Sequence, residues 1–377
     1  MPIPLNKILF ISFDHIGDIL RFTPLLRTLR IQYPQAQITC LIPDTQSAVL
    51  ERYPFIDAVI TFPHAAVREK LKEGESLSSV VDYYGYRLIM MLRRMEFDLV
   101  INPFMELGAI IAGLIRPKQV LGRVMTQWGV YKLFGEHAAK FYHLMSRHNE
   151  LRVQNTMRFS DIALTILKDL AIPEEAFWRK PELYLGDDDR HFAEKFLADG
   201  KLEGQPFRIG FQMGAMLKKE RFWPFEKFAE LARYVHATYG IRPVLFGSPQ
   251  ERIAIERDFM PCAGIPCVVA AGETTLLQAG ALLEKMQLLV SNDTGPMHMA
   301  AALGTPVVAL FGQLTCIVNE ARPWGEQHTV IVGRETKDIE VAAVIAAVEK
   351  YLKDNRERKI THEAHYALNS GNQRSRE

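Results

Sequence analysis

The chain has 377 residues, 48% hydrophobic and 24% charged, a balance typical of a globular protein long enough for two or three domains. Lys and Arg number 45 against 44 Asp and Glu, so the formal net charge of +1 gives no global signature of a nucleic-acid-binding protein. Four scattered cysteines, Cys40, Cys262, Cys267 and Cys316, fit neither a disulfide framework nor a zinc ribbon. No signal-peptide pattern and no run of 18 apolar residues is visible, so we expect a cytoplasmic protein with reduced thiols that does not span a membrane.

The first half of the chain alternates short apolar runs with helical patterns. Helices are predicted near 19–31 and 45–52. The apolar runs that read as strands are 7–13 (KILFISF), 37–43 (QITCLIP), 58–62 (AVITF), 97–104 (FDLVINPF) and 120–123 (VLGR). This order predicts a doubly wound α/β domain.

The segment 127–185 is predicted to be mostly helical, and it contains the basic, aromatic-rich run VYKLFGEHAAKFYHLMSRH at 130–148. One interpretation is an ordinary amphipathic surface with packed aromatic rings and lysines that extend along it to the solvent. The other is a peripheral contact with a membrane or with acidic lipids. The sequence leaves both open.

A second alternating series starts after the acidic run 186–189. Its predicted strands are 208–214, 242–247, 267–271, 288–292 and 306–312, and its predicted helices are 191–200, 225–240, 250–259, 274–286, 297–304 and 339–352. We therefore expect two similar α/β domains, 1–185 and 186–352, followed by a polar tail at 353–377.

Ligands of open α/β sheets bind at the carboxyl ends of the strands, so residues that follow strands are the informative ones. Asp293, Thr294, Gly295 and His298 stand where a strand is followed by a helix. Unpaired N–H groups and the helix dipole make such a junction suitable for a phosphate. The alternative is that Asp293 and Thr294 only cap the helix.

Other strand ends carry further candidates. Gly17 permits a tight turn after the first strand and Asp18 starts the next helix, while Glu251 follows the strand 242–247. The residues after 208–214 supply cations and an aromatic ring, namely Lys218, Lys219, Arg221 and Trp223.

In order and spacing, these blocks resemble glycosyltransferase family 9, the heptosyltransferases of lipopolysaccharide core synthesis. The resemblance covers roughly residues 8 to 350. The residues that carry it are Gly17-Asp18 with Thr23-Pro24, Trp223-Pro224 with 228–232, the run 247–251, and Asp293-Thr294-Gly295 with His298, 300–302 and Pro306. It implies a GT-B fold, in which two Rossmann-like doubly wound domains face a central cleft. The N-terminal domain would bind the acceptor and the C-terminal domain the nucleotide-sugar donor.

The resemblance also implies an inverting reaction that needs neither a metal nor another cofactor. Such a reaction needs one base to take the proton of the acceptor hydroxyl. Asp18 matches the Gly-Asp motif of the family and is the predicted base; Asp14 is the rival, and helix capping is the other reading of Asp18. Asp187 and Asp189 look like a metal-binding Asp-x-Asp pair, but they open a helix, where carboxylates have a dipole explanation.

On the donor side, the N–H groups of Thr294, Gly295 and Met297, with Arg221 or Lys219, are predicted to hold the diphosphate. Asp293 would accept hydrogen bonds from sugar hydroxyls, and His298 would contact phosphate or sugar unless it only packs. Glu251 would bind the ribose diol unless it is a solvated residue at a helix start. Gln212, Met213 and Gly214 follow the first strand of the second domain and are predicted to line the cleft.

Gly17, Asp14 and Asn102 are the acceptor-side candidates. Two departures from the family pattern bear on them and on the donor: Arg221 stands where the family usually has lysine, and 102–106 (NPFME) replaces an Asp-Leu-Gln-Gly-like turn. The second departure leaves the identity of the acceptor open.

The leading functional hypothesis is a glycosyltransferase that moves heptose from an ADP-heptose-type donor onto a lipopolysaccharide-core or related glycan acceptor, at the inner face of the plasma membrane. The alternatives are a GT-B enzyme with another nucleotide sugar and a non-catalytic nucleotide-sugar-binding protein. A Rossmann dehydrogenase and a P-loop NTPase are excluded, because neither glycine motif follows a strand.

Overall fold

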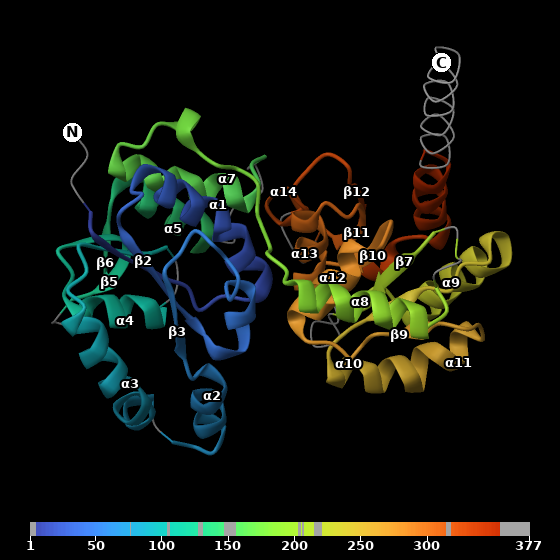
Figure 1. Ribbon diagram of the computed structural model, residues 1–377, viewed down its shortest axis with the longest axis horizontal. Coiled ribbons are helices and arrows are strands. Elements are labelled where there is room, and N and C mark those ends of the chain that lie inside the picture. The colour runs from blue at the N-terminus through green and yellow to red at the C-terminus, as the bar shows by residue number, and fades with distance from the viewer. Residues whose placement is uncertain are drawn as a thin grey trace, which may run out of the picture. The chain divides into compact units, whose positions relative to one another are not determined.

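The computed structural model describes residues 5–75, 77–103, 106–126, 131–146, 156–202, 205, 207–214, 221–313 and 318–354. The chain divides into two compact units (Figure 1). Unit 1 comprises Met1–Arg190, Leu276–Gly280 and Ile317–Trp324, and unit 2 comprises the rest. The predicted boundary lies after residue 185, whereas this division falls after Arg190 and adds two short stretches of the second half to unit 1.

Unit 1 is built on a six-stranded sheet in the order β3-β2-β1-β4-β5-β6. All neighbours are parallel except β6, which is antiparallel to β5. The central strands read as unbroken apolar runs because helices cover both faces of a parallel sheet. The strands are β1 (Lys7–Ile11), β2 (Gln37–Pro43), β3 (Ala58–Phe62), β4 (Leu99–Asn102), β5 (Gln119–Met125) and β6 (Tyr131–Phe134).

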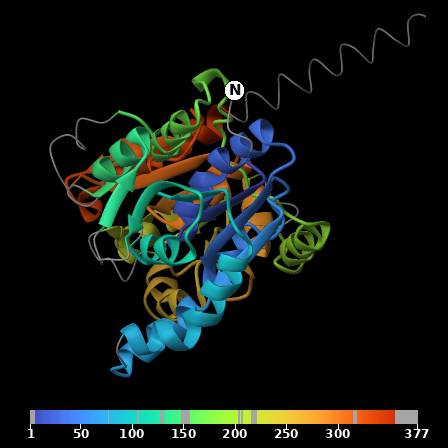
Figure 2. The same ribbon diagram turned by 90° about the vertical axis from the view of Figure 1, so that its left-hand side faces the viewer.

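The helices of unit 1 differ from the prediction in three places. The first begins at Ile16 instead of residue 19, the predicted helix 45–52 is a 3-10 helix, and β6 interrupts the segment predicted to be mostly helical. Figures 1 and 2 show α2 and α3 extending beyond the sheet. The helices are α1 (Ile16–Gln32), η1 (Asp44–Val49), α2 (His64–Lys72), α3 (Leu77–Arg94), α4 (Glu106–Ile115), α5 (Glu136–Ser146), α7 (Phe159–Leu164), η2 (Thr165–Leu170) and η3 (Glu174–Ala176).

Unit 2 carries a second six-stranded sheet, entirely parallel, in the order β12-β11-β10-β7-β8-β9. Its strands are β7 (Ile209–Gln212), β8 (Val244–Phe246), β9 (Val268–Val269), β10 (Leu288–Asn292), β11 (Val307–Gly312) and β12 (Thr329–Gly333). The expected restart of an α/β series is therefore confirmed.

The helices of the second half follow the strands as predicted, apart from a π-helical turn, η5 (Ile255–Phe259), within the segment predicted as one helix. The others are α8 (Asp187–Asp199), α9 (Phe225–Tyr239), α10 (Pro249–Ala254), α11 (Met260–Ala263), α12 (Leu276–Glu284), α13 (Gly295–Leu303), α14 (Val318–Ala321), η6 (Thr336–Asp338) and a helix at 341–354. Of these, α14 and the first half of α12 group with unit 1.

The core of unit 2 fixes the loops that lead to the candidate site. Trp223 is fully buried, its ring centroid lies 4.7 Å from that of Phe228, and its indole N–H donates to the carbonyl of Ile339 at 2.9 Å. A buried indole needs such a hydrogen-bond partner. The chain around Trp223 is thus anchored beneath the sheet edge where the predicted donor residues lie.

Within the part of the chain that the structure describes, no helix combines the length and the apolar character required to cross a lipid bilayer.

Candidate functional site

The donor-side candidates of unit 2 meet at the carboxyl ends of neighbouring strands. In the sheet, Gln212 at the end of β7 lies in register with Ser291 of β10 on one side and Phe246 of β8 on the other. The loops that follow these strands carry Gly214, Glu251 and Asp293. Because parallel strands end at one edge, residues far apart in sequence converge there.

The two carboxylate oxygens of Glu251 have different surroundings: Oε2 caps the helix α10, and Oε1 borders the space beside Gly214. Its Oε2 accepts from the N–H of Ser248 at 2.7 Å, and its own N–H donates to the Ser248 hydroxyl at 3.2 Å, which is the capping box of α10. A Cβ on Gly214 would lie 2.3 Å from Oε1 of Glu251 and 2.5 Å from Nε2 of Gln212. Gly214 therefore leaves the space between a carboxylate and an amide open.

Gln212 borders this space with its amide nitrogen, Nε2. Its side chain is only 3% exposed, and its Oε1 has no hydrogen-bond partner among the described residues. A buried polar atom of this kind needs a partner, and a hydroxyl or amino group of a ligand would supply one. The Glu251 carboxylate accepts and Nε2 of Gln212 donates, so the pair suits a ligand that carries hydroxyl groups, such as a ribose.

The junction between β10 and α13 has the geometry of an anion site. Thr294 precedes α13 with extended backbone (φ −145°, ψ 167°), but its side chain makes no capping hydrogen bond; its hydroxyl lies 3.4 Å from that of Ser291. The capping role considered for Thr294 is therefore not realised. The first turn, from Gly295 through Met297, presents N–H groups that have no acceptor within the helix.

A cation stands beside this helix start. Nη1 of Arg221 lies 2.8 Å from Oδ2 of Asp293, and the two side chains are 29% and 9% exposed. The structure thus brings together Arg221, predicted to bind phosphate, and Asp293, predicted to bind the sugar. Lys218 and Lys219 lie outside the described residues.

The side chains of Met297 and His298 are buried in the first turns of α13. Met297 can therefore contribute its backbone N–H but not its thioether, and the choice between ligand contact and packing stays open for His298.

Asn292 was not identified from the sequence, although it organises this site. Its fully buried amide donates to the carbonyls of Met213 and Gly214 at 3.2 and 3.0 Å, and its Oδ1 accepts from the N–H of Trp223 at 3.2 Å. One side chain of β10 therefore holds both ends of the segment between β7 and α9. A polar residue at the end of a buried strand was the available signal, because a buried amide has to find partners.

In unit 1, Asp18 lies in the first turn of α1, which begins at Ile16 with His15 at the capping position. No side chain caps that helix; instead Asp18 forms an ion pair with Arg21, one turn further on. Arg21 is held by the carbonyl of Glu320 at 3.2 Å and by the ring of Phe159, 4.2 Å from its guanidinium carbon. The helix-capping reading of Asp18 is therefore wrong, and Arg21 is a partner that sequence reasoning missed.

Asp14 lies between β1 and α1 and accepts a hydrogen bond from the Ser12 hydroxyl at 2.7 Å. Burial, and to a smaller extent the neighbouring Asp18 carboxylate, raise the pKa of Asp14 from 3.8 to about 7, against the lowering effects of Ser12 and Arg21. Below pH 7 most molecules therefore carry a proton on Asp14. Gly17, the other candidate here, is buried in α1 and its carbonyl accepts from Arg21 at 3.3 Å.

Asn102 is fully buried at the end of β4 and donates to the carbonyl of Arg123 at 2.8 Å. A Cβ on Gly108 would lie 2.2 Å from its Oδ1, so α4 packs directly against this amide. The side chain links β4, β5 and α4, and its predicted contact with the acceptor stays a prediction. Phe104 and Met105 of the altered turn lie outside the described residues.

Asp189 of the Asp-x-Asp pair at the start of α8, and Asp188 between its members, have structural partners. Asp189 accepts from the N–H of Gly186 at 2.9 Å, and Arg52 pairs with Asp188 at 2.8 Å and with Asp189 at 3.3 Å. Among the residues described, no cluster of three His, Cys, Asp or Glu side chains is placed to hold a metal ion.

Comparison with known proteins places this geometry in a family. The profile of glycosyltransferase family 9 (heptosyltransferase) matches residues 149–347. The chain is 30% identical over 317 residues to lipooligosaccharide heptosyltransferase 2 of Haemophilus ducreyi, covering 81% of this chain and 83% of the relative. It is 29% identical over 321 residues to lipopolysaccharide heptosyltransferase 2 of Salmonella typhimurium, covering 81% and 82%.

Solved structures agree on the fold. A family 9 glycosyltransferase from Veillonella parvula superposes with a TM-score of 0.73 at 22% identity, covering 94% of this chain and 99% of that one. ADP-heptose lipopolysaccharide heptosyltransferase II of Escherichia coli superposes with a TM-score of 0.65 at 22% identity, covering 93% and 99%. The expected GT-B fold class is thereby confirmed. The chain belongs to glycosyltransferase family 9, and it is a glycosyltransferase.

Proposed function

We propose that this enzyme transfers heptose from ADP-heptose to a lipopolysaccharide-core acceptor, with inversion at the anomeric carbon and without a metal. The observation that carries the proposal is the meeting of Arg221, Asp293 and the start of α13 beside the Glu251 subsite. The names of the relatives support heptose as the sugar and a lipopolysaccharide core as the acceptor. The structure of an Escherichia coli heptosyltransferase with ADP supports ADP as the nucleotide of the donor.

The donor would be held by chemistry matched to each of its parts. As the bond between sugar and phosphate breaks, negative charge develops on the leaving diphosphate, and fixed N–H groups and a cation lower the barrier there. The first turn of α13 and Arg221 supply them. A guanidinium offers phosphate two parallel donors, which makes arginine a suitable replacement for the usual lysine. Asp293 lies next to Arg221 and would accept from sugar hydroxyls.

The nucleoside would occupy the space beside Gly214. Oε1 of Glu251 would accept from ribose hydroxyls, and Nε2 of Gln212 would donate to a ribose oxygen or to a ring nitrogen of the base. Because Oε2 of Glu251 is already engaged in the capping box, the carboxylate has a fixed orientation before the donor binds.

Asp18 would act as the base. Inverting transfer requires the acceptor hydroxyl to lose its proton as it attacks the face opposite the leaving group. Asp18 is preferred to Asp14 because it matches the Gly-Asp motif of the family. Arg21 fixes the orientation of the Asp18 carboxylate through their ion pair.

The first test is thermal unfolding with ADP, UDP, GDP and CMP, and then with the matching nucleotide sugars. A ligand at a hundred times its dissociation constant adds about 2.7 kcal/mol to the free energy of unfolding. Stabilisation by ADP and ADP-sugars alone is the expected result. Stabilisation by another nucleotide would show that the donor carries that nucleotide instead of ADP. An unchanged melting temperature with every nucleotide would refute the donor site.

The second test separates binding from catalysis. Asp18→Asn should leave the affinity for ADP nearly unchanged and remove most of the transfer of heptose, whereas the exposed Asp188→Asn should leave both unchanged. Transfer that persists in Asp18→Asn would exclude Asp18 as the base. Transfer that is lost from the wild-type enzyme on addition of a chelator would exclude the metal-independent mechanism.

A further inference from the structure

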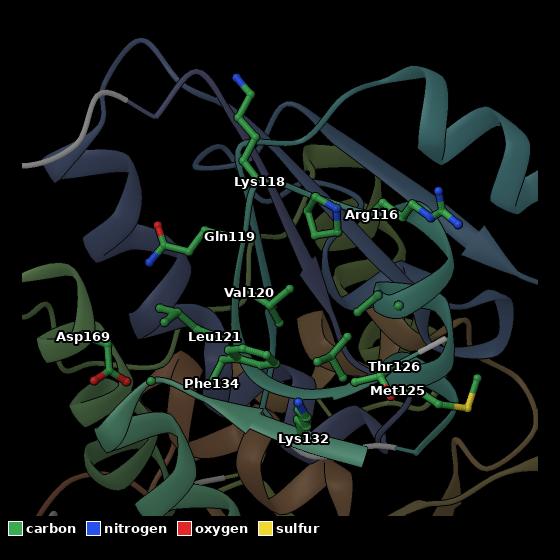
Figure 3. Close-up of a pocket in the computed structure, with 15 residues that line it drawn as sticks. Arg116, Lys118, Gln119, Val120, Leu121, Met125, Thr126, Lys132, Phe134 and Asp169 are labelled. Atoms are coloured by element: carbon green, nitrogen blue, oxygen red, sulfur yellow. The ribbon is translucent and has the colours of Figure 1, made fainter. Parts of the chain in front are cut away.

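A cavity of about 770 Å³ opens on unit 1 between the end of α4 and the strands β5 and β6 (Figure 3). None of the residues assigned above to the donor or to proton transfer lines it. The side chains that matter for its chemistry are Arg116, Lys118, Val120, Val124, Lys132 and Phe134.

The cavity exists because the edge of the sheet is only partly covered. Among the described residues, β6 pairs with β5 from Gly122 to Met125, so the stretch 119–121 has a strand neighbour only on the β4 side. Gly113 lets α4 lie against β5, since a Cβ there would be 1.9 Å from the carbonyl oxygen of Met125. Valines of β5 form an apolar floor, beside which Phe134 is 44% exposed.

The rim of the cavity is cationic. Arg116 and Lys118 lie in the loop between α4 and β5, and Lys132 lies on β6; Figure 3 shows the side chains of Arg116 and Lys118 extending away from the strands. Lys118 pairs with Asp98 at 2.6 Å, while Arg116 and Lys132 have no ion pair within the described part of the chain. The one acidic lining residue, Asp169, accepts from the N–H groups of His137 and Ala138 at 3.0 and 2.8 Å.

The structure divides the basic, aromatic-rich run of the sequence into two parts. On α5, Phe141 is buried with ring centroids 6.1 Å from Phe22 and 5.7 Å from Phe159, which is ordinary packing. On β6, Lys132 and Phe134 point to the cavity instead and remain exposed. The packing interpretation therefore applies to α5, and β6 is left without a role in the core.

We propose that this cavity binds the phosphate headgroup of an acidic membrane lipid and the adjoining part of its acyl chains. Arg116 and Lys132, which have no ion pair among the described residues, lie beside an apolar floor and an exposed aromatic ring. This combination matches a ligand that is anionic at one end and apolar at the other. A soluble phosphate would use the cations but not Phe134. The purpose of the site, bringing unit 1 to the membrane that carries the acceptor, rests on the proposed function; the binding itself does not.

The test is sedimentation of the full chain with phosphatidylcholine vesicles, with and without phosphatidylglycerol. Each cation near an acidic surface contributes roughly fivefold to binding, so R116Q/K132Q should reduce binding to the phosphatidylglycerol vesicles by roughly 25-fold. The control, K195Q/K350Q, removes the same charge from exposed positions of unit 2 and should have little effect. Phe134→Ser should weaken the binding that remains at high salt, where charges are screened.

Binding of the wild-type chain to acidic vesicles, lost in R116Q/K132Q and retained in the control, supports the site. Failure of the wild type to bind acidic vesicles, or equal loss in the control, overturns it. Thermal unfolding of each variant checks that the fold is intact, and ADP affinity should be unchanged in R116Q/K132Q. Because no transfer is measured, a failure here leaves the proposed function untouched.

Discussion

Substituting Gly214 by alanine would test the nucleoside subsite with the smallest possible change. The added Cβ would lie 2.3 Å from Oε1 of Glu251 and 2.5 Å from Nε2 of Gln212, so each atom has to retreat by about an ångström to reach ordinary contact. Both atoms are the far ends of flexible side chains, and residue 214 is not among those with positive φ. We therefore expect the free energy of unfolding to change by less than about 1 kcal/mol.

Donor affinity should fall much further than stability. The methyl group occupies the space where Glu251 and Gln212 would meet the ribose, and it displaces Oε1 of Glu251 and Nε2 of Gln212 from it. A hydrogen bond to a charged group contributes about 1.5–3 kcal/mol, which corresponds to an increase in the dissociation constant of ADP of roughly 10- to 150-fold. Isothermal titration calorimetry of the full chain with ADP measures this directly.

Gly200→Ala is the matched control, because it adds a Cβ in the same unit with its nearest contacts at 3.2 Å from the carbonyl of Phe196 and 3.3 Å from Val268. It should bind ADP as the wild type does. If Gly214→Ala also bound ADP with unchanged affinity, Glu251 and Gln212 would not form the nucleoside subsite, and the reasoning from their geometry would be refuted.

Three further changes probe other parts of the two units. Asp14→Asn should stabilise the protein above pH 7 by about 2–4 kcal/mol and have little effect near pH 4. Between the unfolded pKa of 3.8 and the folded pKa of about 7, the wild type progressively loses the stability that protonated Asp14 provides; an equal pH dependence of the free energy of unfolding in urea for the two proteins would contradict this. Asn292→Ala should cost about 3–5 kcal/mol and also weaken ADP binding, whereas Thr305→Ala, which removes a buried hydrogen bond at the other end of α13, should cost stability alone; equal ADP affinities would rule out a positioning role. Arg221→Met should raise the KM for the donor more than Arg221→Lys does, and equal values in steady-state kinetics would remove the phosphate contact.

Much of the fold follows from local pattern. The strands at the centre of each sheet are apolar runs followed by helical periodicity, and their order predicts both doubly wound domains. The edges are harder to predict. Tyr131–Phe134 alternates half-buried and exposed residues over only four positions, and a helix pattern follows at once, so this antiparallel strand was included in a helical segment. Likewise 44–49 closes as a 3-10 helix.

The candidate site was predictable where chemistry and strand ends coincide. Gln212, Glu251 and Asp293 each follow a buried strand, and neighbouring parallel strands bring them to one edge. What could not be read from the sequence were the partners. Asn292 bonds to residues about 70 to 80 positions away, and Arg21 reaches a carbonyl 299 positions away, so only the folded chain reveals what these side chains hold.

The amide of Asn292 has a consequence for how the donor binds. Since it bonds to Met213 and Gly214 after β7 and to the backbone of Trp223 before α9, both ends of this segment are held in place when unit 2 folds. The conformational entropy of these two backbone positions is then lost during folding and does not oppose association with the nucleotide sugar. For these contacts the donor would meet a preorganised surface, and improvements in affinity would come from the side chains rather than from stiffening the loops.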